Sequence, residues 1–576
     1  MTEPSLELAR PEDAHTRAEW ERAAAAVLRK SGRLRDDDPD ELVEELLTRT
    51  TLDGIAIPPL GLPGGAPPTV RPQRAGGWDI RAMVDHPDPA RANEDALAEL
   101  AGGATSLWVR ADEATDLATV LAGVMLDLAP VVLEAPTGAL AAGTAFLAAH
   151  AGRELHRDTN LGADPLGAML RGLPIAPDEG EAELAGLAGL ARGAGIRAIV
   201  VDATAAHDLG ASDVQELGWS IAVGVAYLRM LTDRGLSVAE AADLIEFRYA
   251  ATDRQFETIA KLRAARRLWC SVLEHSGAGG TVEQRQHAVS SRPMLSKYDA
   301  YVNMLRGTVA AFAAGVGGAE AVTVLPFDAA NGRPEAFGRR IARNLSHLLI
   351  DESHVAVVAD PAGGAHAVER LTADLATAGW AEFQTLEAEW ERGEGLDGFR
   401  DRIAAVVDRR EEQIARRQQP ITGLSEFPNL GERLPEREPD PVADSVRRYG
   451  ASFEALRDEP AARPVFLATL GPVAQHTARA TFAANLLAAG GVPVEVAGAS
   501  ATPADLLASY QGQPVVCLAG TDRAYAEWGE AATQALRDAG ASYVVIAGRP
   551  VAYADDSCAL GADALAFLSR VRKELR

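Results

Sequence analysis

Cysteine is scarce in this sequence of 576 residues, which holds only Cys270, Cys517 and Cys558. Three thiols so far apart are too few for a disulfide framework and do not have the spacing of a zinc site. A reduced compartment is therefore the simpler expectation. The first five residues also lack a basic stretch followed by an apolar one, so the sequence predicts no secretion signal and a cytoplasmic location.

Long apolar runs and an excess of cations are absent too. No run of 18 or more apolar residues occurs, so we expect no segment that spans a membrane. Lysines and arginines number 56 against 82 aspartates and glutamates, which gives a formal net charge of −26. Because nucleic-acid binding needs clustered cations, this balance argues against a nucleic-acid partner, and it favours solubility.

Motifs of several common enzyme classes are also missing. Neither Gly-x-Gly-x-x-Gly nor the P-loop occurs between a strand and a helix, and His-Glu-x-x-His, Cys-x-x-Cys and Gly-x-Ser-x-Gly do not occur at all. These absences argue against dinucleotide binding, P-loop phosphate binding, zinc peptidase chemistry and a serine nucleophile on a strand–helix elbow.

Aromatic residues make up only 5% of the chain, although 47% of its residues are apolar. Alanine, glycine and leucine must therefore carry the packing, which fits close contacts between helices and strands in an α/β protein. The chain is too long for one typical hydrophobic core, so two domains are expected.

The first 50 residues predict a polar helical arm. One helical stretch ends at Val27 and Leu28, and the next has apolar residues at positions i, i+3 and i+4, namely Val43, Leu46 and Leu47. Such an arm could dock on a partner or on another domain, or it could be a solvated lead-in to the first domain.

Residues 51–420 alternate between apolar strands and helical stretches. The clearest candidate strands are rich in β-branched residues and lie at 106–109, 130–133, 198–202, 321–325 and 354–358. Their continuous apolar runs indicate strands buried on both faces, as in a parallel sheet. The alternation fits a (β/α)₈ barrel, but by itself it fits a doubly wound sheet equally well.

Residues 421–463 break this pattern. The run 432–441 is charged and rich in proline, which predicts a linker that is extended and laid over a surface. Residues 464–576 then resume a strand–helix series, with strands at 464–470, 493–496, 514–518 and 542–546 and helices at 478–488 and 524–539. This order is typical of a doubly wound, flavodoxin-like domain.

The stretch from Ser291 to Asp328 reads as a polar loop, a helix and a buried strand. It closely resembles the late barrel segment of the adenosylcobalamin-dependent acyl-CoA mutases, above all methylmalonyl-CoA mutase. Residues 255–269, 341–344 and 352–355 match the same family, and the resemblance runs from about Leu52 to the end of the chain. It implies a (β/α)₈ barrel followed by a cobalamin-type flavodoxin-like domain, and so selects the barrel over the doubly wound alternative.

The family's cobalamin-binding positions are altered in the C-terminal domain. Catalytic relatives carry Asp-x-His-x-x-Gly after the first strand, where the His replaces the lower axial base of the cofactor. The resemblance places Val473, Gln475 and Ala478 at the Asp, His and Gly of that motif. The family's Ser-x-Leu and Gly-Gly elements correspond to Leu518, Ala519 and Gly520 and to Ala547 and Gly548. All three changes together predict that this chain does not bind cobalamin.

Two histidines lie near positions that carry chemistry in the family. His476 is one residue after the axial position, where a capping or solvent-exposed role is favoured over metal ligation. In the barrel, aligning residues 210–216 with the family places Thr204 and Ala205 at a Tyr-His pair that contacts the thioester carbonyl. His207 is two residues farther on and would point elsewhere, so we interpret it as a surface or core polar residue.

Two further family motifs are lost from the barrel. The N-terminal motif Arg-Gly-x-Tyr has no equivalent in residues 70–78. The polar strand Gln-Ser-Leu-His-Thr-Asn of catalytic members is replaced by an apolar run at residues 320–325.

The matched helix at residues 255–269 carries both an apolar face and a set of cations. Phe256, Ile259, Leu262 and Leu268 would form the apolar face. The cations Lys261, Arg263, Arg266 and Arg267 could bind the phosphates of coenzyme A or pair with neighbouring acids, and the lost motifs favour pairing. Residues 360–364 form a glycine-containing turn that geometry alone can explain.

A retained scaffold with altered sites resembles the small subunit of the heterodimeric bacterial members of the family. The resemblance implies no catalytic, cofactor-binding or metal-binding residue in this chain. A homologous large (alpha) subunit would bind adenosylcobalamin and the acyl-CoA, and the heterodimer would interconvert succinyl-CoA and (R)-methylmalonyl-CoA. Two alternatives remain: an active mutase for another acyl-CoA, and a module that stabilises or loads a mutase without being its permanent partner.

Overall fold

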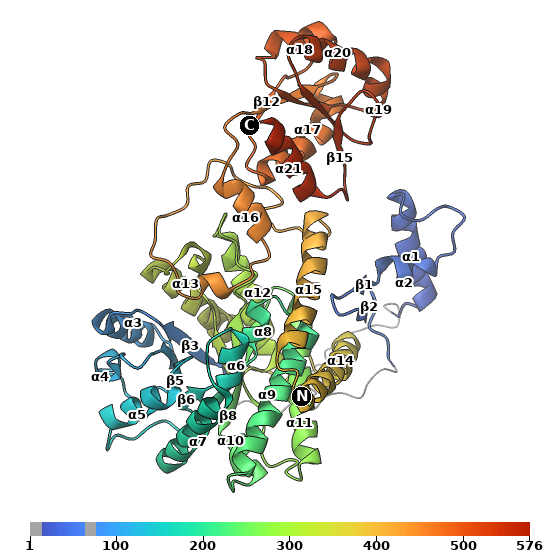
Figure 1. The fold of residues 1–576 in the computed structure, drawn as a ribbon. Coiled ribbons are helices and arrows are strands. Elements are labelled where there is room, and N and C mark those ends of the chain that lie inside the picture. Colours follow the sequence, from blue (N-terminus) through green and yellow to red (C-terminus); the bar gives the residue numbers. More distant parts are fainter. Residues whose placement is uncertain (1–13, 64–75) are drawn as a thin grey trace, which may run out of the picture.

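A computed structural model describes residues 14–63 and 76–576 of the chain. It places a barrel in the middle, a smaller α/β domain above it and a helical arm at one side (Figure 1). In the arm, α1 (Arg17–Lys30) starts with a capping box between Thr16 and Glu19, and α2 (Leu42–Leu47) follows. A short antiparallel ribbon, β1 (Arg49–Thr50) with β2 (Ala56–Ile57), connects the arm to the barrel.

The arm has a small core of its own, made of Ala25, Leu28, Leu34 and Val43. The helical prediction for this segment is confirmed, although Val27 and Leu46 lie at the surface and not in this core. The buried residues of the arm pack against one another, and other apolar side chains of the arm stay exposed to solvent.

Eight parallel strands close into a barrel among the described residues, in the order β10-β3-β4-β5-β6-β7-β8-β9. Their bounds are β3 (Asp79–Val84), β4 (Ser106–Arg110), β5 (Val131–Glu134), β6 (Asn160–Ala163), β7 (Arg197–Asp202), β8 (Ile245–Ala251), β9 (Arg285–Ser290) and β10 (Ala321–Thr323). The (β/α)₈ barrel expected from the resemblance is therefore confirmed, together with four of the five candidate strands.

Helices surround the barrel strands. The long ones are α3 (Pro89–Ala101), α5 (Ala139–Ala149), α7 (Pro177–Ala194), α9 (Asp213–Thr232), α11 (Gln255–His275), α12 (Val302–Gly317), α13 (Ala336–His347), α14 (His366–Glu391) and α15 (Asp397–Ala415). Short helices α4 (Leu117–Val120), α6 (Pro165–Leu170), α8 (Thr204–Asp208) and α10 (Val238–Asp243) follow or precede strands. The apolar residues between this layer and the strands form one continuous core.

The predicted strand at residues 354–358 is wrong. Helix α13 runs on into a π-helical turn, η3 (Leu348–Glu352), and His354 then adopts a left-handed backbone with φ of 54°. The pairing of β10 with β3 has already closed the barrel, so no sheet edge is left for a ninth strand. Without a partner strand, the β-branched run lies at the surface, and Val357 is 78% exposed.

The segment between the two domains is more ordered than a simple linker. It contains α16 (Ala451–Asp458) and buries Leu424 and Phe453. Its proline-rich part contacts the barrel domain, since the carbonyl oxygen of Glu438 accepts from the backbone N–H of Arg333 at 2.7 Å. Farther on, the backbone N–H of Arg447 donates to the carbonyl oxygen of Asp208 at 2.7 Å, and that of Tyr449 donates to Pro293 at 2.9 Å. These contacts cover the end of the barrel where the strands terminate.

A five-stranded parallel sheet forms the C-terminal domain, in the order β12-β11-β13-β14-β15. The strands are β11 (Val465–Thr469), β12 (Val494–Val496), β13 (Val515–Ala519), β14 (Tyr543–Ala547) and β15 (Asp556–Cys558). Helices α17 (Val473–Ala489), α18 (Pro503–Ser509), α19 (Asp522–Ala524), α20 (Glu530–Asp538) and α21 (Ala564–Glu574) flank them. The strand order 2-1-3-4-5 is that of a flavodoxin-like fold, as predicted.

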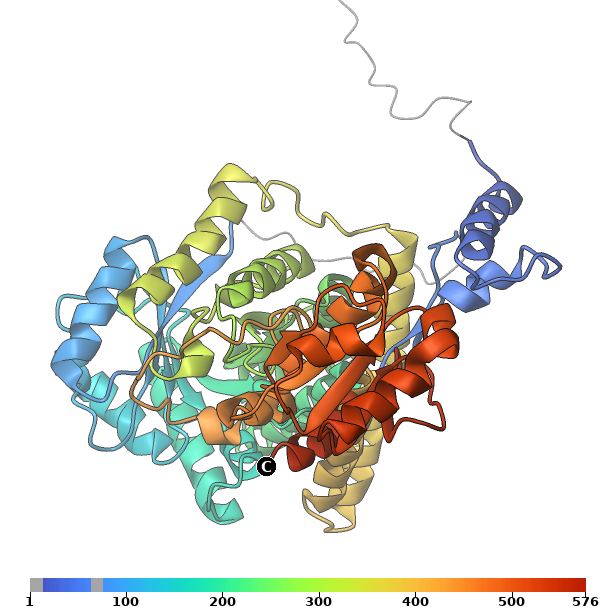
Figure 2. The same cartoon turned by 90° about the horizontal axis from the view of Figure 1, so that it is seen from above.

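Two helices of this domain differ from the prediction. Helix α17 begins at Val473, five residues before the expected start, and a π-helical turn, η5 (Tyr525–Gly529), interrupts the predicted helix at 524–539. Figure 2 shows the domain stacked over the barrel, while the arm extends away to the side. Ile414 of α15 and Phe453 of α16 share one buried cluster with α17 and α21, which joins the two domains.

Candidate functional site

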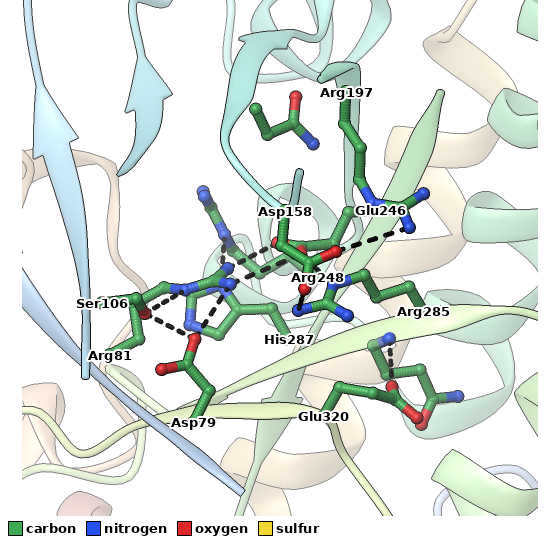
Figure 3. Close-up of polar contacts among 12 residues, drawn as sticks. Asp79, Arg81, Ser106, Asp158, Arg197, Glu246, Arg248, Arg285, His287 and Glu320 are labelled. Atoms are coloured by element: carbon green, nitrogen blue, oxygen red, sulfur yellow. Dashed lines mark hydrogen bonds and ion pairs between the residues drawn. The ribbon is translucent and has the colours of Figure 1, made fainter. Parts of the chain in front are cut away.

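The interior of the barrel is the first place to look for a site, and charged side chains fill it. Alternate residues of a barrel strand point toward the axis. Figure 3 shows that Arg81 of β3, Glu246 and Arg248 of β8, and His287 of β9 converge there. All four are buried, so each must find its polar partners inside the protein.

The lower layer of this interior centres on one ion pair. Arg81 Nη1 donates to Glu246 Oε1 at 2.5 Å, and Arg285 Nε donates to Glu246 Oε2 at 3.2 Å. Ser106 Oγ accepts from Arg81 Nε at 3.1 Å and donates to Asp79 at 2.5 Å. Burial alone would raise the pKa of Glu246, but the charges of Arg81 and Arg285 outweigh it and lower that pKa to about 2.

The middle layer stacks a cation on an aromatic ring. The guanidinium of Arg248 lies 4.0 Å from the ring centroid of Trp108, and its Nε donates to His287 Nδ1 at 3.2 Å. The proton of His287 is therefore on Nε2, which donates to Thr323 Oγ1 at 2.8 Å. Burial, reinforced by the surrounding arginines, holds the pKa of His287 well below its usual value, so this imidazole is neutral.

The upper layer, where the strands end, is again a set of ion pairs. Arg248 Nη1 lies 3.1 Å from Asp202 and 3.2 Å from Glu134, and Arg171 donates to Asp202 at 2.8 Å. Burial opposes ionisation of Glu134, but Arg110 and Arg248 prevail and lower its pKa to about 2. The pKa of Asp202 is lowered in the same way, by Arg171 and Arg248 against burial.

The space left in this layer is small. A cavity of about 30 Å³ lies beside Glu134, Asp164, Arg171, Asp202 and Arg248. That is room for about two water molecules and not for an acyl thioester. The carboxylates of Glu134 and Asp202 beside this cavity are bound to arginines, whereas Nη2 of Arg248 has no hydrogen-bond partner among the described residues.

The predicted barrel positions lie beside this interior. Thr204 Oγ1 donates to Asp202 at 2.6 Å, and Ala205 is fully buried. His207 is a core polar residue: its Nε2 lies 2.7 Å from Ser291 Oγ, and its Nδ1 lies 3.7 Å from Glu216. Burial, together with Lys261, holds the pKa of His207 well below its usual value. None of these groups faces a cavity that could admit a thioester.

The cations of α11 make structural ion pairs, as favoured from the sequence. Lys261 Nζ donates to Glu216 at 2.5 Å and also contacts Asp213 at 2.8 Å. Arg266 binds the carbonyl oxygen of Gly317 at 3.1 Å and the carboxylate of Glu320 at 2.9 Å.

Of three other residues named on this helix, one is buried and two are exposed. Arg263 is buried and pairs with Asp360 and Glu369. Arg267 is exposed, and so is Phe256, which corrects its expected place on the apolar face. Phe256 is the second residue of α11.

Part of the lost barrel motif can also be placed. Residues 70–75 of the segment 70–78 lie outside the described residues. Trp78 is buried, and its Nε1 donates to Ser346 Oγ at 3.1 Å. Of the apolar run 320–325, Thr323 points into the barrel, and its hydroxyl donates to the carbonyl oxygen of Arg81 at 2.8 Å.

In the C-terminal domain the three altered loop positions lie at the start of α17. Val473 is its first residue, and Val473, Gln475 and Ala478 are all exposed. His476 is buried instead of exposed, because its Nδ1 donates to the carbonyl oxygen of Gly471 at 3.0 Å. No imidazole therefore projects from this loop to meet a cobalt ion.

Tyr525 fills the crevice outside the ends of the central strands, where a ligand of such a fold binds. Its hydroxyl accepts from the N–H of Gly520 at 3.0 Å and donates to the carbonyl oxygen of Ala547 at 2.8 Å. Arg479 lies over the Tyr525 ring at 5.0 Å and donates to the carbonyl oxygen of Gly520 at 2.8 Å. The residues present thus do not fit a cobalamin, because the crevice is occupied by the protein itself.

Metal and membrane sites are likewise not found in the described residues. Across 14–63 and 76–576, no group of three or more His, Cys, Asp or Glu side chains could hold a metal ion. Over the same ranges, no helix is long and apolar enough to cross a bilayer.

Sequence reasoning missed most of the residues that define both regions. The signal for the barrel interior was present: Arg81, Glu246, Arg248 and His287 interrupt otherwise apolar strands, with Glu246 and Arg248 two residues apart on one face. No sequence pattern indicated the role of Tyr525, because a tyrosine near the start of a helix is common. Its position over the strand ends depends on the π-helical turn that begins at this residue.

Comparison with known proteins gives consistent matches. The family model described as methylmalonyl-CoA mutase matches residues 116–506. A methylmalonyl-CoA mutase small subunit of Streptomyces virginiae is 47% identical, with 96% of each chain covered. A probable methylmalonyl-CoA mutase small subunit of Mycobacterium tuberculosis is 43% identical over 94% of this chain and 93% of the relative.

A third relative extends the match to another genus. The methylmalonyl-CoA mutase small subunit of Propionibacterium freudenreichii subsp. shermanii is 35% identical over 97% of this chain and 93% of its own length. The family model and these relatives together cover nearly every residue of the barrel and of the C-terminal domain. The chain belongs to the methylmalonyl-CoA mutase family.

Proposed function

We propose that this chain is the non-catalytic small subunit of a heterodimeric methylmalonyl-CoA mutase. The observation that carries the proposal is the filled barrel interior. Arg81 pairs with Glu246 and Arg248 with His287 along the axis, and a cavity of about 30 Å³ is left beside Arg248. The charged side chains on the axis are thus engaged with one another and not presented to a thioester. A second cavity, of about 90 Å³, lies on the β3–β10 side of the barrel next to Arg81 and Val322.

Adenosylcobalamin and the acyl-CoA would both be bound by the large subunit. When bound there, the cofactor supplies the radical chemistry that interconverts succinyl-CoA and (R)-methylmalonyl-CoA. The Tyr525 side chain and the buried His476 support this assignment, because they leave the small subunit's own cobalamin crevice closed. The relatives' names, which each include "small subunit", fit a chain that works with a larger partner.

The contribution of this chain is then structural. It would stabilise the large subunit by burying part of its surface in a permanent interface. Obligate interfaces of this kind bury about 2,000 Å² or more. The N-terminal arm is one segment suited to the role, because it stands clear of the barrel (Figure 1) and exposes Val27 and Leu46.

The test is reconstitution with the large mutase chain from the same genome. Turnover of methylmalonyl-CoA with added adenosylcobalamin is measured for each chain alone and for their mixture, and the molar mass is measured by light scattering. The proposal expects no turnover by this chain, a 1:1 complex, and higher activity and thermal stability of the large chain in the mixture. Turnover by this chain alone, or two separate species at micromolar concentration, would refute it.

A further inference from the structure

Helix α12 differs from the other outer helices of the barrel in what it presents to solvent. Its outward positions recur at helical spacing and hold large uncharged side chains: Tyr301, just before the helix, then Leu305, Val309 and Phe312. Tyr301 and Leu305 are each 68% exposed. A surface helix of a soluble protein normally turns charged residues toward water, so this stripe needs another explanation.

The other outer helices show the usual pattern. Helix α3 exposes Arg91 and Glu94, and α14 exposes Arg370 and Asp374. Helix α5 is as free of charge as α12, but its exposed positions are alanines and Thr144. Among the described barrel helices, α12 therefore stands apart in exposing large apolar side chains with no charge between them.

The polar groups of α12 are turned away from this stripe. Its one charged residue, Arg306, is buried and donates to Ser296 Oγ at 2.9 Å and to the carbonyl oxygen of Thr422 at 2.9 Å. Thr308 donates its hydroxyl back to the carbonyl oxygen of Met304 at 2.7 Å. The outward face of the helix is consequently free of charge, and the hydroxyl of Tyr301, just before the helix, is the one polar group that the stripe itself carries.

Uncharged side chains continue the stripe at both ends of the helix. At its start, the Tyr301 ring stacks on Phe327 at 5.2 Å, and Phe327 meets the half-exposed Phe337 of α13 edge-on at 5.9 Å. Toward its end, Phe312 packs on the same buried cluster as Val355, which precedes the exposed Val357 by two residues. We call the surface of Tyr301, Leu305, Val309, Phe312, Phe337 and Val357 the α12 band.

We propose that the α12 band is the surface on which the large mutase subunit docks. This inference rests on the proposed function and adds the place of contact. The occupant to which we commit is the homologous barrel of the large subunit, because a helix of such a barrel can pack on α12 across a pseudo-two-fold axis. With 16 residues, α12 is about 24 Å long, which suits the apolar centre of a standard interface.

Charge favours this surface over the others. The chain has a net charge of −26, so on most of its surface a docking partner would have to desolvate carboxylates. At the α12 band no carboxylate of the helix faces outward, and the nearby Arg340 lies over Phe337 at 5.5 Å at the rim. An apolar centre with a polar rim is the arrangement that protein interfaces use.

Leu305→Glu places one carboxylate in the middle of the band, at a position exposed enough to leave the fold intact. Leu560→Glu is the matched control, because Leu560 is 87% exposed on the C-terminal domain. Each full-length variant is mixed with the large mutase chain from the same genome, and the dissociation constant is measured by sedimentation. We expect Leu305→Glu to weaken pairing by at least about 100-fold, since it desolvates an unpaired charge, and Leu560→Glu to leave it unchanged.

The outcomes separate this inference from the proposed function. If the unmodified chain pairs with the large chain and Leu305→Glu pairs equally well, the α12 band is not the interface, although the heterodimer stands. If the unmodified chain does not pair at all, both proposals fail. If it forms only a homodimer that Leu305→Glu dissociates, the occupant is a second copy and the assignment to the large subunit is wrong. Tyr301→Glu repeats the test should Leu305→Glu lower the melting temperature of the isolated chain.

Discussion

Arg81 and Glu246 form a salt bridge across the inside of the barrel, with Nη1 and Oε1 2.5 Å apart and neither side chain exposed to solvent. The two residues come from β3 and β8, which are separated in the sheet order by β10 and β9. Desolvating two charges is costly, and the gain over an apolar pair is small unless the remaining groups are also bonded. Here Ser106 and Arg285 supply those bonds, so the pair closes the axis with every polar group in use.

Replacing Arg81 by methionine should destabilise the barrel strongly. The substitution keeps the apolar volume but leaves Glu246 buried with only Arg285 as a cationic partner. Breaking a buried pair in this way costs about 3–5 kcal/mol. Arg91→Met on α3 is the control, because Arg91 is exposed, and it should change the free energy of unfolding by less than about 0.5 kcal/mol. Equal urea midpoints for the two variants would show that the interior pair does not hold the barrel.

The contribution of Asp164 to the stability of the chain should fall as pH rises from about 4 to 7, because this buried carboxyl keeps its proton when folded. Burial, together with the charge of Asp202, raises the pKa of Asp164 from 3.8 to about 7. A carboxyl whose folded pKa is raised contributes stability below its unfolded pKa and loses it as pH rises through the folded value. The window for Asp164 is therefore about pH 4 to 7.

Asp164→Asn isolates the contribution of that one group. It removes the pH-dependent contribution of Asp164, on the order of 2 kcal/mol between pH 5 and 8, and leaves the other titrating groups in place. The melting temperature of the variant, relative to that of the unmodified chain at the same pH, should therefore rise from pH 5 to pH 8. Parallel melting curves across this range would mean that Asp164 is ionised in the folded protein at pH 5.

Restoring the cobalamin loop should not restore cobalamin binding while Tyr525 is present. The triple variant Val473→Asp, Gln475→His, Ala478→Gly supplies the family's loop residues, but Tyr525 still occupies the crevice at Gly520 and Ala547. We expect no shift in the cobalamin absorption spectrum on mixing. A base-off spectrum with the triple variant would show that Tyr525 does not block the crevice.

The role of the Tyr525 hydroxyl can be measured independently of any ligand. Tyr525→Phe removes the hydrogen bonds to Gly520 and Ala547 and leaves these backbone groups unsatisfied, which costs about 1–3 kcal/mol. Tyr301→Phe, at an exposed tyrosine, is the matched control and should leave the free energy of unfolding unchanged within about 0.5 kcal/mol. Equal denaturant midpoints for the two variants would show that the Tyr525 hydroxyl does not stabilise the domain.

Deleting residues 1–45 should weaken the heterodimer without unfolding the barrel. The arm has its own small core of Ala25, Leu28, Leu34 and Val43, so its removal exposes little of the barrel. Light scattering of the truncated chain with the large chain should show a lower fraction of complex than the full-length pair at the same concentration. If the truncated chain pairs normally, the heterodimer is retained and the arm has no part in it.

Much of the fold could be predicted because its signals are local. A continuous apolar run at residues 198–202 indicates the strand β7. Capping residues indicate where helices start, as Ser212 does before α9. The apolar-run criterion wrongly predicted a strand at residues 354–358, because this run has no sheet edge with which to pair. Whether a strand finds a partner depends on closure of the barrel, which no local pattern reports.

The interior of the barrel was predictable in composition but not in pairing. Charged residues two apart in β8 indicate a polar inward face, yet nothing local shows that Glu246 meets Arg81, 165 positions earlier. The same holds for Tyr525, whose role depends on a π-helical turn and on two strands that follow and precede it. Contacts between residues far apart in the sequence determine which side chains meet at these sites, and only the complete fold shows them.

The stoichiometry of adenosylcobalamin in the reconstituted complex tests the central claim most directly. The complex of this chain with the large mutase chain is saturated with cofactor, freed of excess by gel filtration, and its cobalamin content is measured by absorbance against protein mass. A silent small subunit predicts one cobalamin per 1:1 complex. Two cobalamins per complex, or tight binding by this chain alone, would contradict it.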